Sequence, residues 1–122
     1  MSTIEACKSL VHEALVSPDK WQSNLARAEE SLSEALVGDP ENPLLLTCLG
    51  AVLCDQGQHA RATQVLRRAV EHGSQDSNTF FNLGVAVLSC GTHEEAMRLF
   101  SKARSLRPSS QSWEAYFDPH AQ

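Results

Sequence analysis

A repeat of 34 residues is the feature that most limits how this chain can fold. Six residue pairs keep this spacing: Leu49 and Leu83, Gly50 and Gly84, Gly57 and Gly91, His59 and His93, Ala62 and Ala96, and Ala69 and Ala103. A fixed period of this length is typical of stacked supersecondary units, each of which buries its apolar face against its neighbours. We therefore expect a solenoid assembled from similar units.

Helix start and stop signals divide each repeat into two helices. Asn42 is a good N-cap, and Pro43 follows at the first helical position, where its missing N–H costs nothing. Gly57 ends this first helix, and a second helix is predicted from about His59 to His72. In the next repeat, Gly91 makes the same break. Because apolar residues recur at helical spacing and no strand pattern is present, the sequence predicts an all-α fold.

The two ends of the chain fit the same plan less regularly. Ser2 and Glu5 form a capping box for a first helix, and a second helix follows the break at Pro18. Residues 110–117 are predicted to form a short seventh helix that caps the last repeat with Trp113, Tyr116 and Phe117; the alternative is that this aromatic segment docks elsewhere and drives dimerisation. The predicted organisation is a single domain: a divergent repeat at 1–42, repeats at 43–76 and 77–110, and a capping helix and tail at 111–122.

Small residues recur where neighbouring helices must approach closely. Gly50 and Gly84 lie on the apolar stripe of a helix, where glycine costs up to about 1 kcal/mol of helix propensity relative to alanine. A glycine in this place needs a packing reason, and close approach of the partner helix supplies one. Leu66 and Phe100 are the large residues expected to fill the space beside them.

These positions together resemble the tetratricopeptide repeat: Leu-Gly followed by Gly, two alanines seven residues apart, and a closing proline at Pro108. The resemblance covers residues 43–108 well and residues 9–42 weakly. It implies about three antiparallel helix pairs, plus the short C-terminal capping helix, wound into a right-handed superhelix. It also implies that the first helix of each pair lines a concave groove, where such domains usually bind a peptide or a partner helix.

Carried over residue by residue, the resemblance assigns twelve groove positions: Leu44, Thr47, Cys48, Ala51, Cys54, Asp55, Asn78, Phe81, Asn82, Val85, Leu88 and Ser89. Some relatives grip a C-terminal carboxylate with several basic residues and an asparagine. Asn82 resembles that asparagine, but these positions hold no lysine or arginine, and an unpaired buried carboxylate is costly. An apolar groove suits a partner with a few hydrophobic anchors, and Phe81 is the preferred anchor site. The alternative is that Phe81, Val85 and Leu88 pack against a terminal helix or a second copy of the chain.

Composition excludes several other classes of protein. The 122 residues carry ten Lys and Arg against fifteen Asp and Glu, a net charge of −5, which argues against nucleic-acid binding. No apolar run approaches the roughly 20 residues needed to cross a bilayer, and no signal peptide is recognisable. We expect a soluble cytoplasmic protein with no membrane partner. Cys7, Cys48, Cys54 and Cys90 are expected to be free thiols.

No constellation of residues favours catalysis. His59 and His93 are repeat equivalents at turns, with no carboxylate or thiolate spaced to complete a metal site. We expect no catalytic residue, no metal and no cofactor. The sequence favours a protein–protein interaction module, an adaptor or small chaperone that binds a partner segment with apolar anchors. Two alternatives stay open: a self-associating unit, such as a homodimer, and a redox sensor acting through Cys48 and Cys54.

Overall fold

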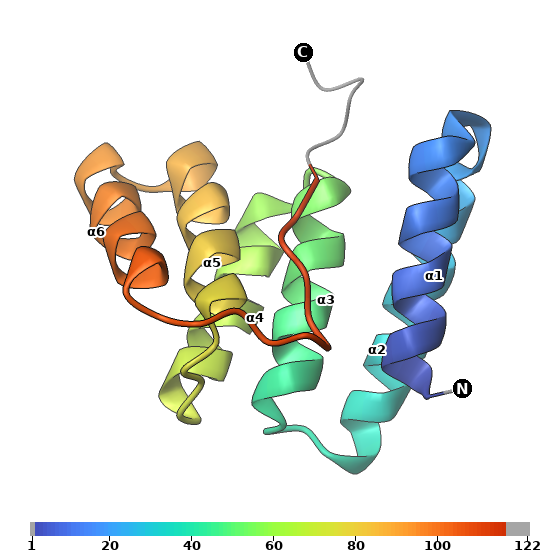
Figure 1. Cartoon of the computed structure of the whole chain (residues 1–122), viewed down its shortest axis with the longest axis horizontal. Helices are drawn as coiled ribbons and strands as arrows, with labels where there is room; N and C mark the ends of the chain where they lie inside the picture. Colours follow the sequence, from blue (N-terminus) through green and yellow to red (C-terminus); the bar gives the residue numbers. More distant parts are fainter. Residues whose placement is uncertain (1, 117–122) are drawn as a thin grey trace.

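The computed structural model describes residues 2–116. Its elements are α1 (Thr3–Val16), the 3-10 turn η1 (Pro18–Lys20), α2 (Trp21–Gly38), α3 (Pro43–Asp55), α4 (His59–Glu71), α5 (Ser77–Cys90) and α6 (His93–Arg104). Residues 2–116 contain no strand, so the prediction of an all-α fold is confirmed. The helices form three antiparallel pairs, α1 with α2, α3 with α4, and α5 with α6 (Figure 1).

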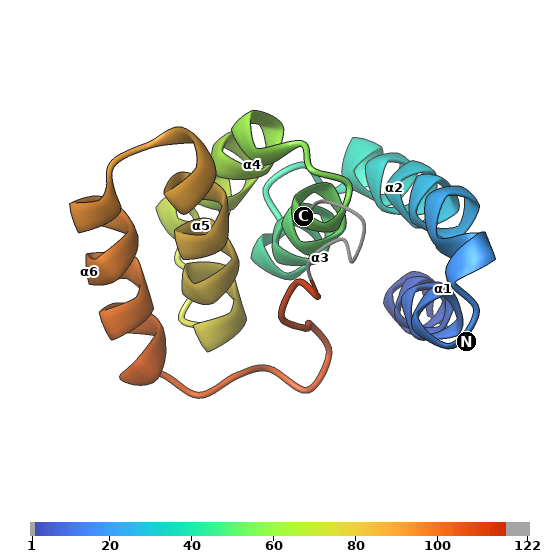
Figure 2. The same cartoon turned by 90° about the horizontal axis from the view of Figure 1, so that it is seen from above.

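The pairs stack in chain order to form an arc. α2 packs on α3, α4 packs on α5, and α3 and α5 also touch directly. Viewed from above, α1, α3 and α5 face the inside of the arc, and α2 and α4 lie on its outside (Figure 2). This arrangement gives the molecule an inner, concave face made by the first helix of each pair.

Capping residues start the helices where the sequence predicts. The Ser2 hydroxyl accepts a hydrogen bond from Glu5 N at 3.1 Å. The Asn42 side chain accepts from Leu44 N at 2.9 Å, with Pro43 at the first helical position. These bonds satisfy backbone N–H groups that have no partner inside the helix, so the boundaries are fixed locally.

Gly50 of α3 and Gly84 of α5 lie where the second helix of their own pair packs closely. A Cβ on Gly50 would overlap the side chain of Leu66, and one on Gly84 would lie 2.7 Å from Phe100 Cε1. Each glycine therefore makes room for a large side chain of the second helix in its own pair. The packing reason expected for these glycines is confirmed.

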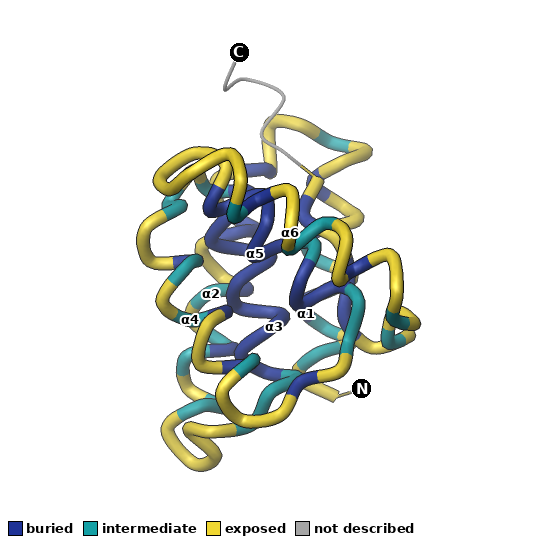
Figure 3. Tube along the Cα trace, turned by 90° about the vertical axis from the view of Figure 1, so that its left-hand side faces the viewer, coloured by how far each residue is buried: buried dark blue, intermediate teal, exposed yellow. Residues whose placement is uncertain are grey.

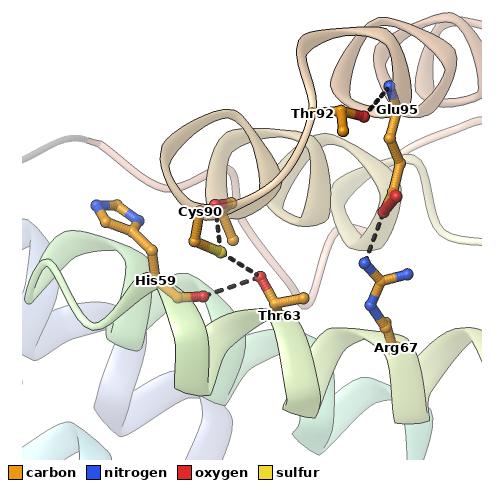
Figure 4. Close-up of polar contacts among 7 residues, drawn as sticks. His59, Thr63, Arg67, Cys90, Thr92 and Glu95 are labelled. Atoms are coloured by element: carbon orange, nitrogen blue, oxygen red, sulfur yellow. Dashed lines mark hydrogen bonds and ion pairs between the residues drawn. The ribbon is translucent and has the colours of Figure 1, made fainter.

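Polar contacts join successive second helices on the outside of the arc. Arg61 of α4 pairs with Glu29 of α2 at 3.2 Å, and Arg67 of α4 pairs with Glu95 of α6 at 2.6 Å. Figure 4 shows the second pair beside the Thr92 cap of α6, whose hydroxyl accepts from Glu95 N. These exposed ion pairs contribute little energy singly, but they fix which faces of the helices meet.

The core runs along the inner helices. α3 is buried from Leu45 to Asp55, whereas α4 buries only a narrow stripe at Ala62, Leu66 and Ala69. In Figure 3 the continuous buried trace follows α3 and α5, while the loops at both ends of the helices are exposed. α3 is therefore covered on its inner side as well as its outer side, and the cover comes from the C-terminal part of the chain.

The prediction of a seventh helix is wrong over residues 110–116, which contain no helix. After α6 the chain turns back into the inside of the arc, crosses α5, and runs along α3 on the side that faces α1 (Figures 1 and 2). Trp113 is buried against this inner surface, not on the outer end of the last repeat as the sequence analysis expected. Phe117, the last residue of the predicted helix, lies outside the described residues.

Candidate partner-binding groove

An extended segment of the chain itself lies in the groove on the inner face. We call residues 108–116 the strap. Its backbone is held from α1, where Lys8 Nζ donates to Ser110 O at 3.0 Å, and from α3, where Cys48 Sγ lies 3.8 Å from Gln111 O. The strongest contacts come from α5 and the residue before it. All of these contacts use side chains of the helices, because the helix backbones are already hydrogen-bonded internally.

Asn82 of α5 holds the strap at two backbone groups. Its Nδ2 donates to Trp113 O at 2.9 Å, and its Oδ1 accepts from Ala115 N at 2.8 Å. Asn82 is fully buried, so both halves of its amide need partners, and the strap supplies them. One side chain thus fixes the strap in an extended conformation at this point.

Asp76 and Asn78 hold the first half of the strap. Asp76 is the N-cap of α5, and its Oδ1 accepts from both Asn78 N and Ser109 N at 2.9 Å. The Ser112 hydroxyl donates to Asp76 Oδ2 at 2.5 Å and accepts from Asn78 Nδ2 at 2.9 Å. The buried hydroxyl of Ser112 is therefore fully paired.

The second half of the strap is apolar. Trp113 is 4% exposed and Ala115 is 6% exposed, and both belong to the main core cluster. Within the described residues, Trp113 Nε1 is buried without a hydrogen-bond partner. Tyr116 extends toward α1, where its hydroxyl lies 3.1 Å from His12 Nε2, and burial raises the pKa of this phenol, with further contributions from Asp55 and Glu114.

Three of the twelve groove positions expected from the sequence, Cys48, Asn78 and Asn82, hold the strap by polar contacts. The other positions have different surroundings. Thr47 bonds Pro43 O at 2.8 Å and Thr79 Oγ1, Ala51 and Asp55 are buried in α3, and Cys54 Sγ donates to Asn82 O. Leu44 is half-buried, while Leu88 and Ser89 are exposed.

Phe81 and Val85 line a separate apolar hollow. It has a volume of about 380 Å³ and is completed by four further residues: Ser77, Phe100, Ala103 and Arg104. The rings of Phe81 and Phe100 lie 5.5 Å apart, so Phe81 packs between the helices of the last pair. The preferred anchor site of the sequence analysis is thus a different place from the surface that the strap covers.

Sequence reasoning missed the strap and the residues that hold it from other elements, chiefly Asp76, Lys8 and His12. One signal was present in the sequence: Trp-Glu-Ala alternates apolar and polar residues, which is the period of an extended segment. Burial alternates in the same way along residues 113–116 of the structure. The serines that follow Pro108 are also poor helix formers that favour bonds to nearby polar groups.

The thiols are free and differ in exposure. Cys7, Cys48 and Cys54 are buried, whereas Cys90 is exposed. Burial raises the pKa of Cys48 and of Cys54 to about 12; Cys7 and Asp76 also raise the first, and Asp55 and Cys90 also raise the second. Reactive thiols need a lowered pKa, so the two cysteines named for redox sensing are chemically unsuited to that role.

Residues 2–116 contain no group of three or more His, Cys, Asp or Glu side chains placed to hold a metal ion. None of the helices in this range combines the length and the apolar character needed to span a bilayer.

Comparison with known proteins decides the family. The family model described as "Tetratricopeptide repeat" matches residues 22–78 and again residues 49–111. This chain belongs to the tetratricopeptide repeat family. The two overlapping matches cover α2 to the start of the strap, so the tetratricopeptide repeats include the α3–α4 and α5–α6 pairs that form most of the groove.

A human protein, Tetratricopeptide repeat protein 7A, is 33% identical over 89 residues. This stretch is 73% of the present chain but only 10% of the relative. The chain therefore spans about a tenth of the length of that tetratricopeptide repeat protein, and the likeness concerns the repeats alone.

Proposed function

We propose that this protein is a non-catalytic adaptor or small chaperone that binds an extended segment of a partner protein on its inner face. Tetratricopeptide repeats generally mediate protein–protein interactions, and the chain belongs to that family. One observation carries the proposal further. The inner face holds an extended peptide, the strap, by the side chains of Asn78 and Asn82 together with a buried apolar contact at Trp113.

The chemistry of this surface suits an extended peptide better than a helix. Asn82 pairs with a carbonyl and an N–H two residues apart, and these groups are free only in an extended segment. In a partner helix both would be bonded within the helix itself. Backbone recognition of this kind supplies affinity, and pockets for single side chains supply specificity.

A pull-down from native lysate tests the proposal. The full chain is used as bait beside three variants: Asn82→Ala in the groove, Phe81→Asp in the separate hollow, and Gln64→Ala on the exposed outside of α4. We expect a partner that the wild type and Gln64→Ala capture and Asn82→Ala loses. Circular dichroism checks that each variant keeps its helical content. A partner captured equally by Asn82→Ala would refute binding in the groove.

A second candidate function is self-association through the last pair of helices. The hollow beside Phe81 and Phe100 is apolar and is lined by residues of α5 and α6, the last two helices of residues 2–116. Sedimentation velocity over a range of concentrations separates the two candidates. Self-association predicts a dimer that Phe81→Asp abolishes, whereas a monomer at all concentrations leaves only binding of a different protein.

A further inference from the structure

We propose that the strap is a built-in competitor for the groove, and that a partner displaces it with a segment of defined pattern. The pattern is a residue with a hydroxyl group, then a large apolar residue, then any residue, then a small residue. This inference rests on the proposed function and names the class of partner. It is derived from the positions that Ser112, Trp113, Glu114 and Ala115 occupy.

The first position of the pattern requires a hydroxyl. The Ser112 hydroxyl donates to Asp76 Oδ2 and accepts from Asn78 Nδ2, and Ser112 is 3% exposed. A hydroxyl is the smallest group that both donates to a carboxylate and accepts from an amide. An aliphatic side chain here would remove the donor to Asp76 Oδ2 and an acceptor of the buried Asn78 amide, which is costly.

The third and fourth positions follow from the clamp at Asn82. Asn82 bonds the backbone on either side of Glu114, whose own side chain is exposed, so the groove does not select the residue at this position. Ala115 is buried directly against the surface that Asn82 belongs to, and a large side chain there would force the N–H away from Asn82 Oδ1.

The second position explains how a partner segment can displace the strap. Trp113 is buried, yet its Nε1 has no hydrogen-bond partner among the described residues. Its indole N–H loses its bond to water and gains nothing in return. A phenylalanine fills an apolar site of this kind without that penalty. The strap is therefore a suboptimal ligand in this position, and a partner with Phe there binds the same surface more tightly per contact.

The helices do not depend on the strap for their own hydrogen bonds. The side chains of Lys8, Asp76, Asn78 and Asn82 form hydrogen bonds to it, and these groups are satisfied by water when the strap leaves. The strap nevertheless competes strongly because its tether to α6 gives it an effective concentration on the order of millimolar. A free peptide binds only the fraction of molecules whose groove is empty.

Fluorescence anisotropy with labelled peptides tests the inference on the full-length chain. The first peptide copies residues 107–116, and the second carries Phe in place of the residue at 113. Three proteins are compared: the wild type, Trp113→Ala, which weakens the strap without changing the groove, and Glu114→Ala, a control on the exposed side of the strap. We expect Trp113→Ala to bind the Phe peptide about ten-fold or more tighter than the wild type. Glu114→Ala is expected to match the wild type.

The wild type alone gives a second measurement that needs no destabilised variant. The amides of Ser109 and Ala115 are protected by Asp76 and Asn82, so saturating Phe peptide is expected to speed hydrogen exchange across residues 108–116 of the chain. Ser112→Ala provides a milder release of the strap if Trp113→Ala fails to fold, as judged by circular dichroism.

The outcomes separate this inference from the proposed function. If the wild type and Trp113→Ala bind the peptide with equal affinity, and hydrogen exchange across residues 108–116 is unchanged, the strap does not compete for the groove. Binding of a partner in the groove is then still possible. Binding of neither peptide by any folded chain overturns both. A Phe peptide that binds more weakly than the Trp peptide overturns the claim that the unpaired indole N–H makes the strap a suboptimal ligand.

Discussion

Asn82 and Ala115 are joined by a hydrogen bond of 2.8 Å across 33 residues of sequence. The same amide donates to Trp113 O at 2.9 Å, so one buried side chain satisfies two backbone groups that a helix would pair internally. A helix over residues 110–116 would leave the buried Asn82 with neither bond. The extended conformation of the strap is therefore selected by α5 and not by the local sequence.

Replacing Asn82 should release the strap. Asn82→Ala removes both backbone bonds, and we expect the free energy of unfolding to fall by about 1–3 kcal/mol. In a Trp21→Phe background, where Trp113 is the one remaining tryptophan, its emission should shift to the red and acrylamide should quench it more strongly. Ser89→Ala, an exposed change on the same helix, is the control. Unchanged quenching in Asn82→Ala would show that this clamp does not hold the strap.

Gly50 and Gly84 should not tolerate even a methyl group. Gly50→Ala places a Cβ inside the volume of Leu66, and Gly84→Ala places one against Phe100. Both side chains fill the interior of their hairpins, so we expect each change to cost about 1–3 kcal/mol by overpacking. Urea denaturation measures this loss.

Gly38 offers a matched comparison for those two changes. It is the last residue of α2, and an added Cβ would meet nothing within 4 Å. Gly38→Ala should therefore be neutral or stabilise by up to about 1 kcal/mol, because alanine favours the helix. If all three glycine variants lost equal stability, the close approach of the helices would not be the cause.

The helix pairs could be predicted from the sequence because the signals for them, helix caps and packing residues, are local and occur in both repeats. Asn42 and Pro43 fix the start of α3 within a few residues, and Gly50 with Leu66 states the packing of a hairpin that Gly84 and Phe100 repeat. Agreement between the caps, the apolar spacing and the period left one arrangement of the helices. No contact from outside the repeat was needed.

The strap could not be predicted because its conformation depends on distant residues. Trp113 and Tyr116 stand three residues apart, which also fits one face of a helix. The deciding partners, Asp76 and Asn82, precede them by more than 30 residues. For the groove, repeat position assigned Asn78, Asn82 and Phe81 alike to the inner face. Asn78 and Asn82 contact the strap, whereas the ring of Phe81 packs on Phe100, and repeat position alone does not distinguish these two surroundings.

The buried thiols should make the protein less stable in alkali. Burial raises the pKa of Cys48 and of Cys54 from 9.0 to about 12 in the folded chain. Between these values the unfolded chain loses protons that the folded chain keeps, so stability is fully present below about pH 9 and falls as the pH rises toward 12. The expected slope is about 1.4 kcal/mol per pH unit for each thiol.

Urea titrations at pH 8 and pH 10 under reducing conditions measure this loss, which is expected to total about 1.4 kcal/mol for each thiol because only the upper half of the interval lies above pH 9. Cys48→Ala and Cys54→Ala should each lower the stability at pH 8 and reduce the loss between the two pH values, because each removes one titrating group. Tyr116, whose pKa is also raised, adds to the alkaline loss equally in all three chains and cancels in the comparison. An unchanged slope in both variants would show that these thiols ionise alike in the folded and unfolded chains.

Alkylation of the native protein should report the position of the strap. At pH 8 the thiolate fraction of a group with a pKa of about 12 is about 1,000-fold lower than that of an ordinary thiol, so iodoacetamide should label the exposed Cys90 and leave Cys48 and Cys54 almost unmodified. Trp113→Ala should raise the labelling of Cys48, whose Sγ faces Gln111 O of the strap.

Cys54 serves as the internal control in this experiment, because its Sγ faces Asn82 O of α5 and not the strap. Mass spectrometry of tryptic peptides should show faster modification of Cys48 alone. Equal acceleration at both cysteines would mean that the substitution loosens the whole core. No acceleration at either would mean that the strap does not shield the inner face. Selective exposure of Cys48 is thus the result that distinguishes a removable occupant of the groove from a structural part of the fold.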